Sequence, residues 1–539
     1  MTLSSRRPGQ LALLACAALF ALAAGYALGA APNPGWFSDS LDYLLLADFF
    51  RGHFTGLPSV LGTELFGTSR FPPLFPLQLA LSGVGLDTPE RARLVVLATA
   101  CLMLLVASVW LRKATGSALL AACVLAGSLL TPRYFLFLLE LQSEFLYLLL
   151  LMGSLYLAQR YREGRCSLLL LCAVASLLPL ARMAGLAMLA GLTLWLLLTA
   201  PRSGLRQRLL ACVALGLPAA LWLGYRRMLP IELDYLQDLG PAQGGVPGQL
   251  AAIVSAAPAR LLGSVVNQFS TAPGPLVRLA VGLILLAALA GWWQRLGQRE
   301  VDALMLPLGI GLTLVWPYPA EDARLMAVLM PMLMLSAWAG LRLGCAALPA
   351  LARRAAPAHA AGALLFGLVL LATASTWTVF VARASTPVAP ELASGKRALV
   401  YFTAPERGAA VSLELMLRLK FLAADVPRRV PREDCVWSAM PALSAYYGGF
   451  ETRFRRLPRG LGAGPESRGR LAGCRYVLVS YLNTGEDFGP LYPAPEIRTF
   501  SKPLLVSSMD WNGQDTVAAA LFQLLPDAGQ AQPPARRAP

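Results

Sequence analysis

The chain has 539 residues, of which 56% are hydrophobic and 14% are charged. Soluble domains carry roughly 25% charged residues, so this composition excludes an ordinary soluble protein and indicates a polytopic membrane protein. The formal net charge of +16 would suit nucleic acid, but no basic stripe interleaved with aromatic residues is present, so no nucleic-acid partner is expected.

The first predicted element is an apolar run at 11–30, which follows Arg6 and Arg7. The length of this run predicts an uncleaved membrane anchor rather than a signal peptide, with the N-terminus in the cytoplasm. The connection that follows it, 31–90, is too long and too rich in both carboxylates and bulky apolar residues for a plain hairpin between two spans. We therefore expect it to be an outer loop with structure of its own.

A short helix is predicted in this first outer loop. Apolar residues recur there at helical spacing, at Leu41, Leu44, Leu45 and Phe49. The pattern predicts a helix that lies on the membrane surface, with Asp39 in its first turn. We expect Asp42 and Asp48 to lie on the solvated face of this helix.

Ten further apolar runs are predicted as membrane spans. They lie at 91–111, 116–132, 135–158, 167–180, 183–199, 208–228, 276–293, 302–317, 324–345 and 361–382. Pro179 and Arg182 divide the longer run 167–199 into two of these spans, because proline breaks a helix and a charge is costly in the bilayer. With the first run, about eleven spans predict an all-α polytopic membrane domain over 1–384.

The distribution of charge predicts how the spans are oriented. Alternate connections are short and basic, as expected on the cytoplasmic side: Arg112 with Lys113, then 160–165, 202–208, 295–299 and 342–354. Arginines at 91, 93, 226 and 227 run against this rule. An odd number of spans places the C-terminal tail outside the cytoplasm, and the Ala/Leu/Arg/Gly bias favours a multi-pass protein of a bacterial inner (plasma) membrane.

Two polar segments are expected on the outer side. The connection 229–275 is rich in Gly, Pro and Ala and is expected to be a mobile flap. The tail 385–525 is predicted to form a small periplasmic α/β domain, followed by a disordered end at 526–539. Within this tail the predicted strands are 398–403, 476–480 and 517–525, and the predicted helix is 411–422. An extracytoplasmic location permits a disulfide between Cys435 and Cys474, but their pairing is left open.

Charged side chains gather at the outer ends of the predicted spans. They are Asp39, Asp42, Arg70, Arg133, Glu140, Glu144, Arg182, Glu321, Asp322 and Arg324. Arginine presents paired donors to phosphate oxygens, and a carboxylate can accept a proton from an attacking hydroxyl. The combination therefore points to group transfer from a lipid-linked phosphate to a hydroxyl-bearing acceptor.

At these positions the chain resembles the GT-C superfamily of membrane glycosyltransferases, which use polyprenyl-phosphate sugars. It looks most like the aminoarabinose-to-lipid A transferases and the protein O-mannosyltransferases. The matching positions are Asp39, Tyr43 and Ala47; Arg70-Phe71-Pro72-Pro73-Leu74; Ser143-Glu144-Phe145-Leu146; and Arg324 with Pro331. The chain departs from the family pattern at Ser40, where many relatives have Glu, and at Arg70, where Lys is frequent.

The resemblance implies a reaction and a set of site residues. Sugar would pass from a polyprenyl-phosphate donor to a lipid, glycan or protein acceptor in the cell envelope, with inversion at the anomeric carbon. Asp39 would be the general base, Glu144 would orient the acceptor, the sugar or a metal ion, and Arg324, Arg70 and Arg182 would bind the lipid phosphate. Tyr43 and Arg133 complete the expected substrate-binding set.

Several alternatives stay open at this point. Asp39 could cap the surface helix, and the arginines could be interfacial anchors. A divalent metal ion is an open alternative as a cofactor, since carboxylates are present without a compact cluster. A lipid-linked-sugar flippase or transporter is the second function considered, although transporters are expected to place charges near mid-membrane and to show a repeat. A non-enzymatic assembly protein is the third.

Overall fold

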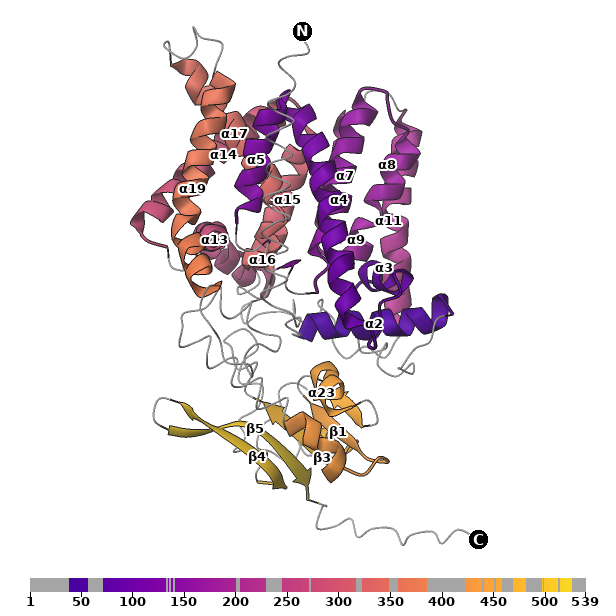
Figure 1. Cartoon of the computed structure of the whole chain (residues 1–539). Coiled ribbons are helices and arrows are strands. Elements are labelled where there is room, and N and C mark those ends of the chain that lie inside the picture. The colour runs from indigo at the N-terminus through magenta and orange to yellow at the C-terminus, as the bar shows by residue number, and fades with distance from the viewer. Residues whose placement is uncertain are drawn as a thin grey trace. The chain divides into compact units, whose positions relative to one another are not determined.

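The computed structural model describes residues 38–56, 71–131, 134, 137–138, 141–199, 204–228, 245–270, 273–316, 322–348, 357–384, 422–438, 441–449, 452–457, 469–480, 497, 499–511 and 514–525. These residues form two compact units, one helical and one built around a β-sheet (Figure 1). The predicted division into a helical part and an α/β tail has the same order, and the exact boundaries at 384 and 525 stay predictions.

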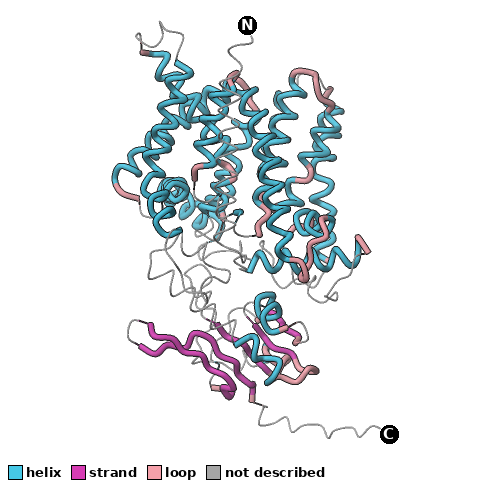
Figure 2. Tube along the Cα trace, viewed as in Figure 1, coloured by secondary structure: helices cyan, strands magenta, loops and turns pink. Residues whose placement is uncertain are grey.

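The helical unit contains fifteen described helices. They are α2 (Ser38–Phe54), α3 (Leu74–Leu81), α4 (Pro89–Thr115), α5 (Ala118–Leu129), α7 (Glu144–Arg162), α8 (Leu168–Ala175), α9 (Leu178–Ala181), α10 (Gly185–Thr199), α11 (Leu205–Arg227), α13 (Gly245–Phe269), α14 (Pro275–Gly297), α15 (Val301–Val315), α16 (Asp322–Ala327), α17 (Met330–Ala347) and α19 (Pro357–Ala384). Figure 2 shows that most of them run side by side, while α2 lies crosswise to α4 and α7.

Local sequence explains where several of these helices begin and end. α4 starts with Pro89, which suits a first helical turn, and ends at Gly116, whose φ of 72° is left-handed. The hydroxyl groups of Ser117 and Ser167 accept hydrogen bonds from the backbone amides of Leu120 and Leu170, and so cap α5 and α8.

Each of the ten predicted spans inside the described part of the chain corresponds to a helix or to two consecutive helices. Three expected single helices differ from the structure. The run 167–180 forms α8 and α9, and 324–345 forms α16 and α17. In 135–158 the described residues 141–143 are not helical, and α7 begins only at Glu144. Among the described residues, α4, α11, α14, α17 and α19 contain apolar stretches long enough to cross a membrane. The chain is therefore a membrane protein. The total of about eleven spans stays a prediction, and the run 11–30 lies outside the described residues.

The backbones of α14 and α17 approach each other closely. A β-carbon added at Gly291 would collide with backbone atoms of Ser336 and Gly340, and one at Gly340 would collide with the carbonyl of Ala287. Small residues spaced four apart on both helices let the two backbones approach, which is a common packing mode inside membranes.

The second unit contains a five-stranded sheet, with strand order β2-β1-β3-β5-β4. Its elements are β1 (Cys435–Ser438), α23 (Pro441–Gly448), β2 (Arg453–Arg456), β3 (Tyr476–Ser480), β4 (Ser501–Trp511) and β5 (Gln514–Leu524). β2, β1 and β3 are parallel, whereas β5 pairs antiparallel with β3 and β4. The predictions of strands at 476–480 and 517–525 are confirmed by β3 and β5. The predicted strand 398–403 and all but the last residue of the predicted helix 411–422 lie outside the described residues.

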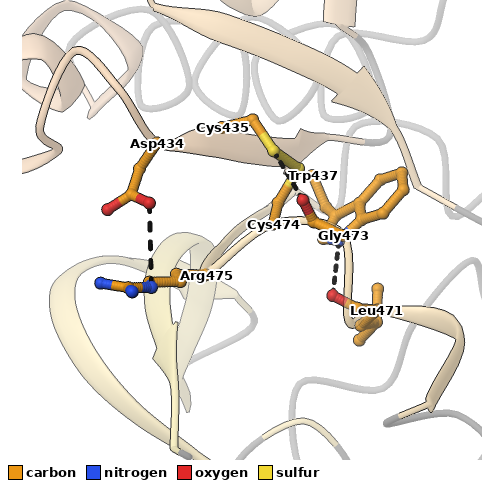
Figure 3. The surroundings of a disulfide bond; sticks show 7 residues. All are labelled: Asp434, Cys435, Trp437, Leu471, Gly473, Cys474 and Arg475. Carbon is orange, nitrogen blue, oxygen red and sulfur yellow. Dashed lines mark hydrogen bonds and ion pairs between the residues drawn. A yellow bond between two sulfur atoms is a disulfide. The ribbon is translucent and has the colours of Figure 1, made fainter. Parts of the chain in front are cut away.

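A disulfide joins β1 to the segment just before β3. The pairing of Cys435 with Cys474, which the sequence left open, is therefore present. Cys435 and Cys474 are bonded, with their Cα atoms 4.9 Å apart (Figure 3). The indole of Trp437 lies beside the disulfide and donates a hydrogen bond of 2.9 Å to the carbonyl of Leu471. Both cysteines and Trp437 belong to the core of this unit, together with Val477, Ala520 and Phe522. The bond therefore fastens the sheet through its own hydrophobic core.

Candidate functional site

Three residues singled out in the sequence meet in the helical unit. The side chains of Arg182 and Arg324 both form an ion pair with the same carboxylate oxygen of Glu144, Oε1. Glu144 is fully buried, and each arginine side chain is 14% exposed. These residues are 38 and 142 positions apart along the chain, since Arg182 follows Glu144 by 38 and Arg324 follows Arg182 by 142. Only the folding of the helices brings them together.

The helix ends explain how the three side chains are placed. Glu144 is the first residue of α7, where the backbone amides and the helix dipole stabilise a negative charge. Arg182 has an extended backbone and lies in the break between α9 and α10. Arg324 belongs to α16, the six-residue helix that precedes α17. All three are held where a helix starts or is interrupted.

The cluster also contains buried polar atoms that could bind a ligand. Two guanidinium groups contact one carboxylate oxygen in a largely buried place. The second carboxylate oxygen, Glu144 Oε2, and the hydroxyl of Tyr147 one turn later in α7 are buried and have no hydrogen-bond partner within the described part of the chain. The described part of the cluster thus combines arginine donors with polar atoms able to bind a ligand.

A second motif residue reaches the start of α7. The hydroxyl of Tyr43 in α2 forms a hydrogen bond of 3.0 Å with the hydroxyl of Ser143, which directly precedes Glu144. The Tyr43 ring also contacts Phe71 and Phe75, with ring centroids 4.7 and 5.0 Å apart. Tyr43 of the first motif and Phe71 of the second therefore pack together, and Tyr43 reaches the residue before Glu144.

The face of α2 that was expected to be solvated is buried, so that expectation was wrong for Asp48. Its side chain is fully buried, accepts a hydrogen bond of 3.1 Å from Arg51 and accepts another from the backbone amide of Leu86. Arg51 also donates to Asp87 at 2.7 Å. Burial opposes ionisation of Asp87, but the hydrogen bonds from Arg51, Thr88 and the backbone, together with the charge of Arg51, outweigh it and lower the pKa of this carboxyl group. These contacts fasten α2 to the loop between α3 and α4.

Most of the remaining predicted site residues lie outside the described part of the chain. Asp39 lies in the first turn of α2, and its side chain is outside the described part. Arg70 and Arg133 lie outside the described residues, as do Glu140 and Glu321. Their roles therefore stay predictions.

The expected outer flap is a helix over its second half. Residues 229–244 are outside the described part, but 245–269 form α13, so the expectation of a mobile flap was wrong there. Two of its side chains, Arg260 and Gln268, contact the segment around α16. Neither Arg260 nor Gln268 was predicted as a functional residue from the sequence. A usable signal existed for Arg260, because it is the only charged residue between positions 239 and 277.

No group of three or more His, Cys, Asp or Glu side chains comes together to hold a metal ion within the described residues. The divalent ion considered from the sequence stays an open alternative.

Comparisons with known proteins show a likeness among solved structures. No family model matches the chain, and no curated protein matches it. Among solved structures, the cryo-EM structure of the arabinofuranosyltransferase AftD from Mycobacteria aligns with a TM-score of 0.49 and 15% sequence identity. The alignment covers 96% of this chain and 40% of AftD, so this chain spans less than half the length of that protein. A likeness this low assigns neither a family nor an activity to this chain.

Proposed function

We propose that this chain is an integral-membrane glycosyltransferase that moves a sugar from a polyprenyl-phosphate donor to an acceptor hydroxyl at the outer face of the membrane. The observation that carries the proposal is the cluster of Arg182 and Arg324 on one oxygen of buried Glu144. Guanidinium groups present paired donors that suit the oxygens of a lipid phosphate, and a lipid-linked donor suits a site in a helical membrane unit.

The two arginines would act on the leaving group. As the bond between the anomeric carbon and the phosphate oxygen breaks, the electron pair remains on the polyprenyl phosphate. Guanidinium groups held in a largely buried place stabilise that developing negative charge more strongly than water does. Glu144 would hold both groups in place through Oε1 and leave Oε2 to accept a hydrogen bond from a sugar hydroxyl.

Asp39 would act on the other side of the reaction. Its carboxylate would take the proton from the acceptor hydroxyl as the acceptor oxygen forms its bond to the anomeric carbon. Attack opposite to the leaving phosphate gives inversion. This role rests on the sequence motif that joins Asp39 to Tyr43 four residues later, and Tyr43 contacts Ser143 next to Glu144. Arg70 and Arg133 would extend the binding of donor or acceptor.

The disulfide supports placing the C-terminal unit outside the cytoplasm. Structural disulfides persist in oxidising compartments such as the bacterial periplasm and are rare in the cytosol. The bond between Cys435 and Cys474 therefore agrees with a periplasmic tail and with a site on the outer face of an inner membrane. The acceptor would then be a lipid, glycan or protein of the cell envelope.

The test is sugar transfer by the purified full-length protein in lipid nanodiscs, supplied with radiolabelled polyprenyl-phosphate sugars and an envelope fraction. We expect Asp39→Asn and Arg324→Gln to reduce transfer by about 100-fold or more, because the first removes the base and the second a charge on the leaving group. Glu300→Gln is the matched control, because it removes one carboxylate partner of an arginine, Arg162, away from the cluster.

Each outcome has a definite meaning. Loss of transfer in both site variants, with activity retained in Glu300→Gln, supports the proposal. Equal transfer by wild type and Asp39→Asn would move the base to another residue. Movement of the sugar lipid across the bilayer without transfer would replace the glycosyltransferase by a flippase.

A further inference from the structure

The side chain of Arg260 joins three parts of the helical unit. Arg260 projects from the middle of α13 and makes a two-pronged ion pair with Asp322, at 2.8 Å from Nε to Oδ2 and 2.6 Å from Nη2 to Oδ1. The same guanidinium donates to the backbone carbonyls of Leu314 at 2.7 Å, Trp316 at 3.1 Å and Thr313 at 3.3 Å. One side chain thus makes five hydrogen bonds that bridge the end of α15 and the start of α16.

A second side chain of α13 holds the next residue of α16. The amide of Gln268 is buried and donates a hydrogen bond of 2.6 Å to the backbone carbonyl of Ala323. Its other bond, of 2.9 Å, goes to the carbonyl of Ser264 in its own helix. Asp322 and Ala323, the two residues directly before Arg324, are therefore both tied to α13. Figure 1 shows α13 and α16 close together in the helical unit.

These bonds stabilise two local features, the short helix α16 and the last carbonyl groups of α15. α16 has six residues, and a helix this short gains too few internal hydrogen bonds to hold its own position. The chain leaves α15 at Trp316, where the last carbonyls of a helix lack partners within it. The planar guanidinium of Arg260 reaches these carbonyls and a carboxylate at once, which the three donors of a lysine ammonium on a flexible stem cannot reproduce.

We propose that Arg260 and Gln268 are positioning residues, which fix α16 so that Arg324 meets Glu144 at the candidate site. This inference rests on the proposed function, in which Arg324 binds the donor phosphate. Neither residue touches the cluster itself through the contacts described above. Their effect reaches it through Asp322 and Ala323.

The helical unit offers a matched control in Arg295. Its Nε and Nη2 atoms make a two-pronged ion pair with Asp302 at 2.7 and 2.6 Å, nearly the same geometry as that of Arg260 with Asp322. Asp302 lies in the first turn of α15, at the opposite end from Thr313 and Leu314. Arg295→Lys therefore disturbs an ion pair of similar geometry, between α14 and α15, without touching α16.

The experiment compares wild type, Arg260→Lys, Gln268→Met, Arg324→Gln and Arg295→Lys as full-length proteins in nanodiscs. The probe is polyprenyl phosphate without a sugar, and its binding affinity is measured beside the thermal unfolding midpoint. We expect Arg260→Lys and Arg324→Gln to bind the probe roughly 10- to 100-fold more weakly, because a displacement of about 1 Å is enough for such a loss. Gln268→Met removes only the bond to Ala323 and should show a smaller loss.

The stability measurement separates positioning from a general loss of structure. Arg260→Lys and Arg295→Lys should lower the unfolding midpoint to a similar degree, but only Arg260→Lys should lose affinity for the probe. If both lose affinity equally, or if Arg260→Lys binds like wild type while Arg324→Gln does not, the positioning role is wrong and the proposed function stands.

A structural readout tests the positioning step without any ligand. In a cryo-EM structure of Arg260→Lys, or of Gln268→Met should the lysine variant not fold, α16 should be shifted and Arg324 should have left Glu144. Retention of the Arg324–Glu144 ion pair in both variants would overturn the inference. If wild type binds no polyprenyl phosphate, the proposed function fails. The cryo-EM structures of the variants still decide whether Arg260 and Gln268 position Arg324.

Discussion

At the scale of single residues, the most consequential contact of the helical unit is the one that Arg182 and Arg324 share on Glu144. Removing one partner from a buried ion pair leaves an uncompensated charge, which commonly costs about 3–5 kcal/mol. Exposed pairs contribute far less, because water solvates the separated charges. The position of a charged pair thus matters more for stability than its number of contacts.

We predict that Glu144→Gln lowers the free energy of unfolding by about 3–5 kcal/mol, because both guanidinium groups then lose the buried carboxylate that they share. The measurement is thermal unfolding of the purified full-length protein in detergent. Glu163→Gln is the control, since it removes the carboxylate from the partly exposed pair with Lys113 and should cost about 1 kcal/mol or less. Equal losses in the two variants would contradict this reading of the cluster.

The residue types of the cluster also explain how far the site could be predicted from the sequence. Glu144 and Arg182 stand out in the sequence because a charge within an apolar run is costly unless it is paired or used. Arg324 stands out only through its motif. Tyr147 gives no such signal, because a tyrosine in an apolar helix is ordinary until its hydroxyl is found buried without a described partner.

At the scale of elements, the packing of α14 on α17 depends on the absence of side chains. We predict that Gly340→Ala destabilises the protein by about 1–3 kcal/mol, because the new methyl group meets the backbone of Ala287 and Gly291, which cannot rotate away.

The same helix supplies the control for this prediction. A β-carbon at Gly344 meets nothing within 4 Å, so Gly344→Ala should be neutral or slightly stabilising through reduced backbone entropy in the unfolded chain. Unfolding midpoints of the two variants in one detergent give the comparison. A loss as large in Gly344→Ala would contradict the close approach of α14 and α17 as the cause of the effect at Gly340.

Element boundaries could be predicted where the chemistry is local. Pro179 and Arg182 correctly placed the break between α9 and α10. The break between α16 and α17 was missed, because the apolar run continues through it and gives no breaker before Pro331. Likewise the Gly, Pro and Ala of 245–269 were taken for a flap, whereas packing and hydrogen bonds with α16 and α19 sustain α13.

At the scale of the whole molecule, the sheet unit is closed by the disulfide between two cysteines that are 39 residues apart. We predict that Cys435→Ser combined with Cys474→Ser destabilises this unit by about 3–4 kcal/mol, because the unfolded chain regains the entropy of an open loop. Limited proteolysis of the full chain should then cut the sheet region sooner and leave the helical unit intact.

A reducing agent should reproduce this effect in wild type and add nothing in the double variant. Cys101→Ser serves as the control, since Cys101 is free and exposed, and it should behave like wild type. A reductant effect that persists in the double variant would show that another disulfide stabilises the protein.

The sequence by itself determined that the chain is a membrane protein, and it indicated which charged residues are candidates for a functional site. Hydrophobic runs reveal membrane helices because a helix satisfies its own backbone hydrogen bonds, and short apolar runs in the polar tail predicted β3 and β5. The tertiary structure alone decided that Asp48 is buried, that Glu144, Arg182 and Arg324 converge, and that Arg260 holds the approach to Arg324. Such contacts join positions up to 180 residues apart, and no local pattern encodes them because they arise from the packing of helices against one another.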